Sequence, residues 1–237
     1  MLNSIGLENI GVEAVLRDKA PMWVEWDVPV IVNIAGHTED EYREVARRLD
    51  GVSGVAALEV NISCPNVEHG GLEFGTNREA AASLVGAVRD STDLPMIVKL
   101  SPNVTDIVAI ARAVVDAGAD ALCVVNTVKG TAIDVANRRF RLGRPAGGLS
   151  GPAIKPVALH MVHAVASALD VPVIGCGGIA TSEDALEFIM AGATAVQVGT
   201  ATFTEPRSML AAVDGIAEYM RRESIGGLED IRGVVGV

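Results

Sequence analysis

The sequence predicts an α/β protein built as a (β/α)8 barrel, with six of the eight strands present in this chain. Six short apolar segments rich in β-branched residues recur along the chain, and each precedes a segment with helical periodicity. Nearly continuous apolar strands are typical of a parallel sheet that is covered on both faces. Polar residues or glycines lie at or next to the carboxyl ends of all six segments, and in barrel enzymes this rim carries the chemistry.

The expected strands and helices follow one another in a regular order. Helices are expected at residues 106–115 and 182–190, and an Ala-Gly-Ala tripeptide follows each of them, with the glycine at the usual C-terminal cap. The chain opens on a loop-like segment, so the two missing strands belong at the front of the barrel. The six strands are expected at residues 28–33, 58–63, 96–100, 122–127, 172–178 and 195–200.

Composition limits the class of protein. The chain has 237 residues, of which 49% are hydrophobic, which suits a single domain over residues 1–237. A net charge of −11 argues against nucleic acid as a partner. Three scattered cysteines fit neither a disulfide framework nor an iron–sulfur cluster, and they favour a reducing cytoplasm. The sequence has neither a signal-peptide pattern nor an apolar run long enough to span a membrane.

The hexapeptide Asn-Ile-Ser-Cys-Pro-Asn at residues 61–66 is the most informative motif. It begins where the apolar run 56–60, interpreted as a buried strand, comes to an end. A cysteine in such a polar turn can lose its proton and then remove a proton beside a carbonyl group. Cys64 is therefore the predicted catalytic base, whereas Cys123 and Cys176 are interpreted as buried structural residues.

Other polar residues at the strand ends predict a planar polar ligand and a phosphate. Four asparagines can pair with a ring that alternates carbonyl and N–H groups: Asn3, Asn61, Asn66 and Asn126. Lys99 ends an apolar strand, where an anionic ligand, a carboxylate or solvent would offset the cost of its charge. The pairs Gly177-Gly178 and Gly199-Thr200 are typical of a phosphate site.

The polar connection over residues 129–151 is long for a compact domain. It is rich in glycine and carries four arginines, at positions 138, 139, 141 and 144. Loops of this length are usually functional or disordered. We expect this one to cover the substrate and exclude water.

Together these motifs resemble the catalytic subunit of class 1 dihydroorotate dehydrogenases, and most of all their heteromeric, NAD-linked branch. The likeness runs through nearly the whole chain in the order of the family. The segments that carry it are NSIGL (3–7), VNIAG (32–36), NISCPN (61–66), FGT (74–76), VKLSPN (98–103), VNT (125–127), GGLSGPAIKP (147–156), GCGGI (175–179) and VGTA (198–201).

The resemblance implies an FMN at the barrel mouth and oxidation of dihydroorotate to orotate for UMP synthesis, with Cys64 as the base and the flavin as hydride acceptor. Lys99 would stabilise the reduced ring. The implied FMN contacts are Asn33, Asn61, Lys99, Val125, Gly151, Gly177, Gly178, Gly199 and Thr200. The implied substrate contacts are Asn3, Ser4, Ile5, Gly6, Leu7, Asn61, Asn66, Asn126 and Thr127.

The resemblance also implies partners and leaves alternatives open. The NAD-linked branch passes electrons through a separate subunit with FAD and an iron–sulfur cluster, on a homodimeric catalytic core. The alternatives are a fumarate-linked enzyme, a dihydropyrimidine dehydrogenase-like enzyme and an inactive remnant that binds a partner. Family members carry two more strands before residue 3, including a lysine that touches flavin and substrate, so we hypothesise that this chain is N-terminally incomplete.

Overall fold

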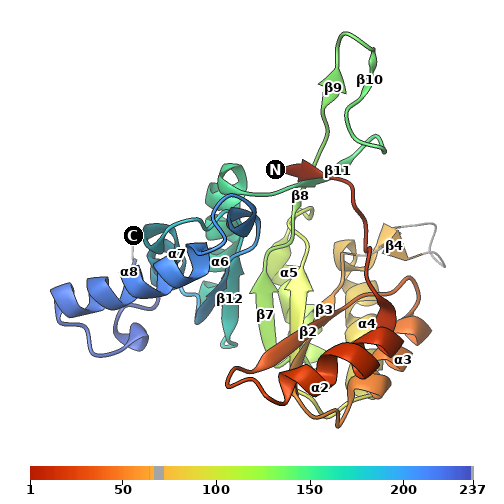
Figure 1. The fold of residues 1–237 in the computed structure, drawn as a ribbon, viewed down its shortest axis with the longest axis horizontal. Coiled ribbons are helices and arrows are strands. Elements are labelled where there is room, and N and C mark those ends of the chain that lie inside the picture. Colours follow the sequence, from red (N-terminus) through yellow and green to blue (C-terminus); the bar gives the residue numbers. More distant parts are fainter. Residues whose placement is uncertain (64, 67–71, 236–237) are drawn as a thin grey trace. The chain divides into compact units, whose positions relative to one another are not determined.

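The computed structural model describes residues 1–63, 65–66 and 72–235. These residues group into two compact units (Figure 1). The N-terminal unit contains Gly6–Leu100 and Ala109–Leu122. The C-terminal unit contains Met1–Ile5, Ser101–Val108 and Cys123–Val237. The single folding domain expected from the sequence stays a prediction.

The N-terminal unit is built on parallel strands. β2 (Val30–Ile34), β3 (Val55–Asn61) and β6 (Met96–Leu100) lie side by side in that order, and the first residues of β7 (Ala121–Val124) follow β6. The core between the sheet and its helices is fully buried and includes Tyr42, Leu58 and Leu84.

Helices connect these strands, as the periodicity predicted. α3 (Glu39–Leu49) follows β2, α4 (Arg78–Arg89) follows β3, and α5 (Ile107–Asp116) joins β6 to β7. Side-chain caps begin two of them, because Thr38 accepts a hydrogen bond from the Glu41 N–H and Asn77 accepts one from the Ala80 N–H.

Short elements fill the remaining parts of this unit. α1 (Gly11–Ala14), the π-helical turn η1 (Val15–Lys19) and α2 (Ala20–Trp23) precede β2. After β3, β4 (Pro65–Asn66) pairs antiparallel with β5 (Leu72–Glu73), and the 3-10 turn η3 (Phe74–Thr76) follows.

The C-terminal unit continues the alternation of strands and helices. The last residues of β7 are followed in the sheet by β12 (Val173–Cys176) and β13 (Ala195–Gln197), which pair in parallel. The helices are α6 (Lys155–Ala168), α7 (Ser182–Met190) and α8 (Ser208–Glu223). Three 3-10 turns complete the unit: η4 (Pro152–Ile154), η5 (Thr200–Phe203) and η6 (Leu228–Asp230).

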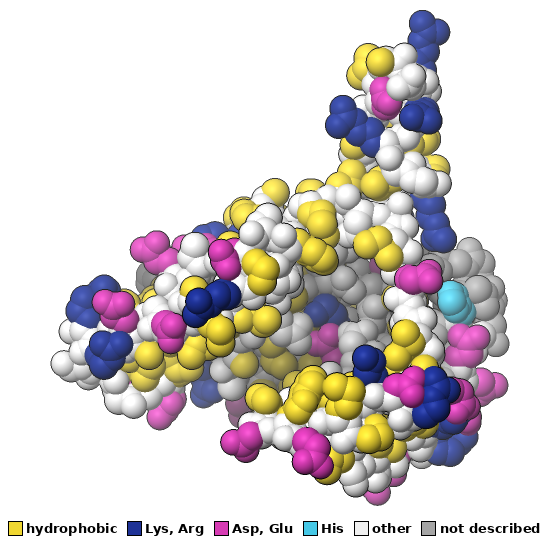
Figure 2. Space-filling view, viewed as in Figure 1, with side chains coloured by type: hydrophobic (Ala, Val, Ile, Leu, Met, Phe, Trp, Pro, Cys, Tyr) yellow, Lys and Arg dark blue, Asp and Glu magenta, His cyan; other side chains and the backbone are white. Residues whose placement is uncertain are grey.

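The prediction for residues 129–151 was wrong in one respect, because this connection contains strands. β9 (Ile133–Asp134) and β10 (Arg139–Phe140) form an antiparallel hairpin. β8 (Val128–Gly130) and β11 (Gly147–Leu149) pair at its base, and β1 (Leu2–Asn3) pairs with β11. Figure 2 shows Lys and Arg side chains along this hairpin. The loop-like opening segment is therefore part of a small three-stranded sheet.

All six predicted strands form, in the predicted order. The strand at 96–100 has the predicted bounds, and the others differ by a few residues at their ends. The two predicted helices form as α5 and α7. The α/β class with six strands is thus confirmed. In the part of the chain that the structure describes, no helix is long and apolar enough to span a membrane.

Candidate functional site

Four polar side chains lie on one face of the N-terminal sheet. Asn33 on β2 pairs in register with Glu59 on β3, and Asn61 on β3 pairs with Lys99 on β6. Glu59 and Asn61 are two residues apart on one strand, so their side chains share a face. Residues paired in register also share a face, which places all four together at the carboxyl ends of three neighbouring strands.

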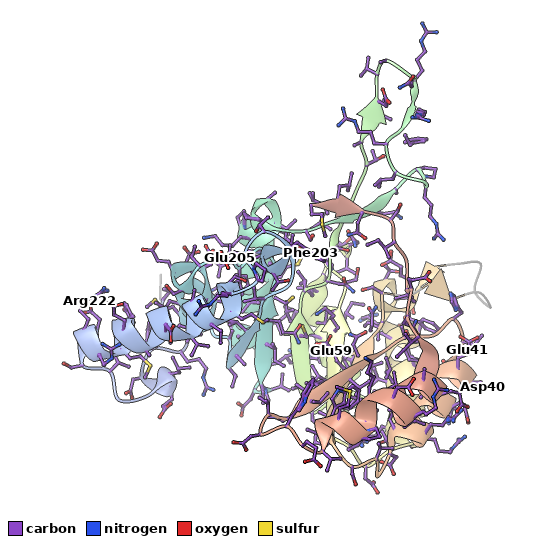
Figure 3. All side chains as sticks on the ribbon, in the orientation of Figure 1. Asp40, Glu41, Glu59, Phe203, Glu205 and Arg222 are labelled. Atoms are coloured by element: carbon purple, nitrogen blue, oxygen red, sulfur yellow. The ribbon has the colours of Figure 1, made fainter. Side chains whose placement is uncertain are left out.

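Glu59 links two of these residues directly. Its Oε1 accepts a hydrogen bond from Asn33 Nδ2 at 2.6 Å, and Lys99 Nζ lies 3.4 Å from the same oxygen. The Lys99 and Glu59 side chains are only 14% and 7% exposed. Figure 3 labels Glu59 on this sheet. A carboxylate was among the partners expected for Lys99, and Glu59 supplies one.

Glu59 was missed in the sequence. It stands in the run 56–60, which was interpreted as a plain buried strand. A carboxylate inside such a strand is costly without a partner. Glu59 lies two residues before Asn61 on the same strand, and this spacing was the available signal that its side chain shares a face with the expected site.

Two neighbours fix Asn61. The Tyr42 hydroxyl, which is fully buried, donates to the Asn61 carbonyl oxygen at 2.5 Å. The Ser63 N–H donates to Asn61 Oδ1 at 3.1 Å, which directs the amide nitrogen of Asn61 the other way. Cys64 lies outside the described residues, and the side chain of Asn66 does too, so the proposed base is not placed.

Leu7 and Asn33 line one pocket of the N-terminal unit. The segment that follows the expected substrate loop lies against the end of β2 here. The other polar residues of the lining are Glu8, Asn9, His37 and Glu41. Gly6 precedes this segment, with a φ of +81°. The pocket thus brings one residue of the expected substrate loop to one of the expected flavin contacts.

In the C-terminal unit, glycines let backbone segments approach closely. Gly178 has a φ of +80°, and a Cβ there would lie 2.8 Å from Lys155 N and 2.9 Å from Gly151 O. Gly177 has a φ of +136°, and its Cβ would lie 2.7 Å from Ala158 Cβ. Only glycine fits this turn.

Thr200 begins the 3-10 turn η5, and Gly199 is its N-cap. The first N–H groups of a helical turn have no acceptor within that turn, so they are available to an anion. The Thr200 hydroxyl donates to Ser150 Oγ at 2.7 Å, next to Gly151. A cradle of backbone N–H groups without side chains suits a phosphate.

An ion-paired lysine supports this glycine turn. Lys155 Nζ donates to Asp184 Oδ1 at 2.7 Å and to Glu187 Oε1 at 3.0 Å. Asp184 also accepts from the N–H groups of Ala180 and Thr181 and completes a capping box at the start of α7. Burial acts to raise the pKa of Asp184, but these hydrogen bonds outweigh it and hold that pKa below its ordinary 3.8. The same two carboxylates raise the pKa of Lys155.

We expect Asp184→Asn to lower the free energy of unfolding by about 2 kcal/mol at neutral pH, because it breaks charge-assisted hydrogen bonds. The folded-state pKa is depressed, so this stabilisation is present above pH 3.8 and lost as the pH falls further. The variant should therefore be less stable than the parent at neutral pH, and the difference in stability should shrink as the pH falls below 3.8. Thermal melts across pH test this, with the exposed Asp170→Asn as control. Equal loss at all pH values would contradict it.

The residues expected to bind substrate in this unit meet around β11. The Asn3 backbone pairs with Gly148, and a Cβ on Gly148 would lie 2.4 Å from Thr127 Oγ1. The Ile5 N–H donates to Asn3 Oδ1 at 3.4 Å, which turns the chain after Ser4. The structure therefore brings Asn3 and Thr127 to opposite sides of one short strand.

Asn103, which was not among the predicted site residues, holds the backbone of Thr127 and Lys129. Its Nδ2 donates to the Thr127 carbonyl oxygen at 3.2 Å, and its Oδ1 accepts from the Lys129 N–H at 2.8 Å. Asn126 Oδ1 accepts from the Thr127 N–H at 2.8 Å. The Val125 N–H donates to the Cys176 carbonyl oxygen at 2.8 Å. Asn103 closes a matched motif, so its place in the sequence was the available signal.

Among the residues that the structure describes, Cys123 and Cys176 form no disulfide. Cys123 is fully buried, and its Sγ donates to Gln197 Oε1 at 3.3 Å. The interpretation of Cys123 as a buried residue is confirmed, whereas Cys176 is only partly buried.

The alternating fold, the polar strand ends and the glycine turns together define an α/β enzyme of the barrel type. The family model for dihydroorotate dehydrogenase matches residues 1–220. This chain therefore belongs to the dihydroorotate dehydrogenase family, whose members are flavin-dependent oxidoreductases with a TIM-barrel fold.

Curated relatives agree with this family. A protein of Geotalea daltonii is 54% identical over 237 residues, which cover 100% of this chain and 78% of the relative. One of Trichlorobacter lovleyi is 55% identical over 236 residues, covering 100% and 77%. One of Geotalea uraniireducens is 54% identical over 235 residues, covering 99% and 77%. All three are named dihydroorotate dehydrogenase B (NAD(+)), catalytic subunit.

Proposed function

We propose that this chain oxidises (S)-dihydroorotate to orotate in UMP biosynthesis, with FMN as its cofactor and NAD as the final electron acceptor. The observation that carries the proposal is the in-register group of Asn33, Glu59, Asn61 and Lys99 at the strand ends. It supplies a cation, hydrogen-bond donors and acceptors on one face, which suits both a flavin ring and a pyrimidine. The identity of about half over the whole chain to relatives with this name supports it.

The residues present fit FMN. Side chains are absent from Gly177, Gly178 and Gly199, which would leave the backbone N–H groups there accessible to a phosphate. Lys99 would face the electron-rich edge of the ring. When bound, FMN supplies the hydride acceptor. The proposed ring and ribityl contacts are Asn33, Asn61, Lys99, Val125 and Gly151, and the proposed phosphate contacts are Gly177, Gly178, Gly199 and Thr200.

The chain's own residues would bind the substrate and move its proton. Cys64 would take the proton from C5 of dihydroorotate while the hydride leaves C6, so that the C5–C6 bond becomes double. Asn61, with its carbonyl and amide fixed by Tyr42 and Ser63, would orient the ring. The other proposed substrate contacts are Asn66, Asn126, Thr127 and residues 3–7.

Electrons would leave through a partner. The name of the relatives, a catalytic subunit, implies that they work with a separate subunit. We propose that such a subunit carries FAD and an iron–sulfur cluster for this chain as well, since three cysteines, one of them the proposed base, are too few for the usual four cluster ligands. A homodimer of this chain would form the catalytic core.

Addition of dihydroorotate to the FMN-loaded protein under anaerobic conditions should bleach the visible flavin band. One orotate should appear for each flavin bleached, because each oxidation delivers two electrons. Dihydrouracil is the control and should leave the band unchanged, since it lacks the carboxylate of dihydroorotate. A protein that takes up no FMN, or one that only dihydrouracil reduces, would contradict the proposed function.

A further inference from the structure

Glu59 is a buried carboxylate in the middle of a parallel sheet, where charge is expensive. The residue is only 5% exposed, and strand neighbours flank it on both sides. A buried ion pair rarely adds to stability compared with apolar residues of the same size. The presence of Glu59 at this position therefore needs an explanation beyond stability.

We propose that Glu59 is a positioning residue that holds the Lys99 ammonium and the Asn33 amide on the sheet face and partly neutralises the lysine charge. This inference rests on the proposed function, in which Lys99 and Asn33 contact the flavin. Glu59 is not itself among the proposed flavin or substrate contacts.

The geometry carries the positioning part of the proposal. One oxygen, Glu59 Oε1, lies 2.6 Å from Asn33 Nδ2 and 3.4 Å from Lys99 Nζ. The two partners come from the strands on either side of β3, so the carboxylate links three neighbouring strands. A lysine side chain has many rotamers, and an anion at a fixed backbone position restricts them.

The negative charge of Glu59 supports the second part of the proposal, the partial neutralisation of Lys99. A lysine beside a flavin favours the reduced ring, because that ring is anionic. A carboxylate 3.4 Å from the ammonium opposes this effect. Glu59 would thus lower the preference of the site for reduced flavin, which lets electrons move on to the next acceptor. Removal of its charge should raise that preference.

The first experiment needs no flavin. Carbamylation of Lys99 by cyanate, which attacks only the neutral amine, is followed by peptide mass spectrometry in the 237-residue protein, with exposed Lys19 as the internal reference. Glu59→Gln keeps the shape and an acceptor oxygen but removes the charge, and it should speed the labelling of Lys99 about tenfold. The exposed Glu79→Gln should leave it unchanged. Equal Lys99 rates in parent and Glu59→Gln would overturn the proposal.

The second experiment measures the midpoint potential of the bound FMN. Glu59→Gln should favour reduced over oxidised FMN about tenfold, a positive shift of about 30 mV for a two-electron couple. In a Lys99→Gln background, Glu59→Gln should shift the ratio of reduced to oxidised FMN by less than about threefold, because the lysine through which Glu59 acts is absent. Equal shifts in both backgrounds would show that Glu59 does not act through Lys99.

Two further variants keep the result decisive. If Glu59→Gln does not fold, the double variant Glu59→Gln/Lys99→Gln should fold, because it removes both charges of the pair. In Glu59→Asp, which keeps the carboxylate, Lys99 should be carbamylated at the rate seen in the parent. Failure of both to fold would assign Glu59 a packing role and overturn the proposal. Should the parent take up no FMN, the proposed function fails, and the labelling of Lys99 still decides whether Glu59 holds it.

Discussion

Cys64→Ala is expected to lower kcat for dihydroorotate by about 100- to 10,000-fold, the usual contribution of a positioned general base. The affinity for FMN should stay within about threefold of the parent, since the thiol is not among the proposed flavin contacts. Anaerobic stopped-flow reduction of the flavin measures the chemical step directly. Cys64→Ser should retain part of the rate and gain activity as the pH rises, because a hydroxyl is a weaker acid than a thiol.

Cys176→Ala is the matched control for this prediction. It removes the partly buried thiol of Cys176, and it should leave the reduction rate within about threefold of the parent. A loss in this control as large as that in Cys64→Ala would show that the assignment of the base to the motif at 61–66 is wrong.

Gly178→Ala is expected to destabilise the protein by roughly 2–5 kcal/mol and to abolish FMN binding at micromolar concentrations. The new Cβ would lie 2.8 and 2.9 Å from backbone atoms of Lys155 and Gly151, and the φ of +80° is strained for alanine. The backbone would have to move in the very turn proposed to hold the phosphate. Thermal melts and fluorescence titration with FMN test both effects.

Gly86→Ala is the control for this variant. Gly86 lies inside α4, and a Cβ there meets nothing within 4 Å. Alanine should therefore stabilise the helix by about 0.5–1 kcal/mol and leave FMN binding unchanged. If Gly178→Ala binds FMN as tightly as Gly86→Ala, the glycine turn is not the phosphate site.

Local pattern was enough to predict the strands and the helices. Segments such as 96–100 and 182–190 are long enough, and apolar enough on the right face, that their own periodicity determines them. The positions of the polar residues were predicted in the same way, because the end of each apolar segment in the sequence marks the carboxyl end of a strand. This is why Asn33, Asn61 and Lys99 were expected at one rim.

Long-range pairing could not be predicted in the same way. Lys99 meets Glu59 because β3 and β6 pair in a particular register, which the chain between these two residues does not reveal. The strands in residues 129–151 are two or three residues long, and β11 depends on pairing with Leu2 and Asn3. Asn103 likewise orders Thr127 through contacts distant in sequence.

The pairing of Leu2 with Leu149 also sets an order of events during synthesis. Residues 2 and 3 cannot pair with β11 until residue 149 has left the ribosome. The parallel strands β2, β3 and β6 lie earlier in the sequence and can assemble first. Residues 3–7, which are proposed to bind the substrate, would then be among the last to fold. Newly made protein should therefore form its core before it can bind the substrate.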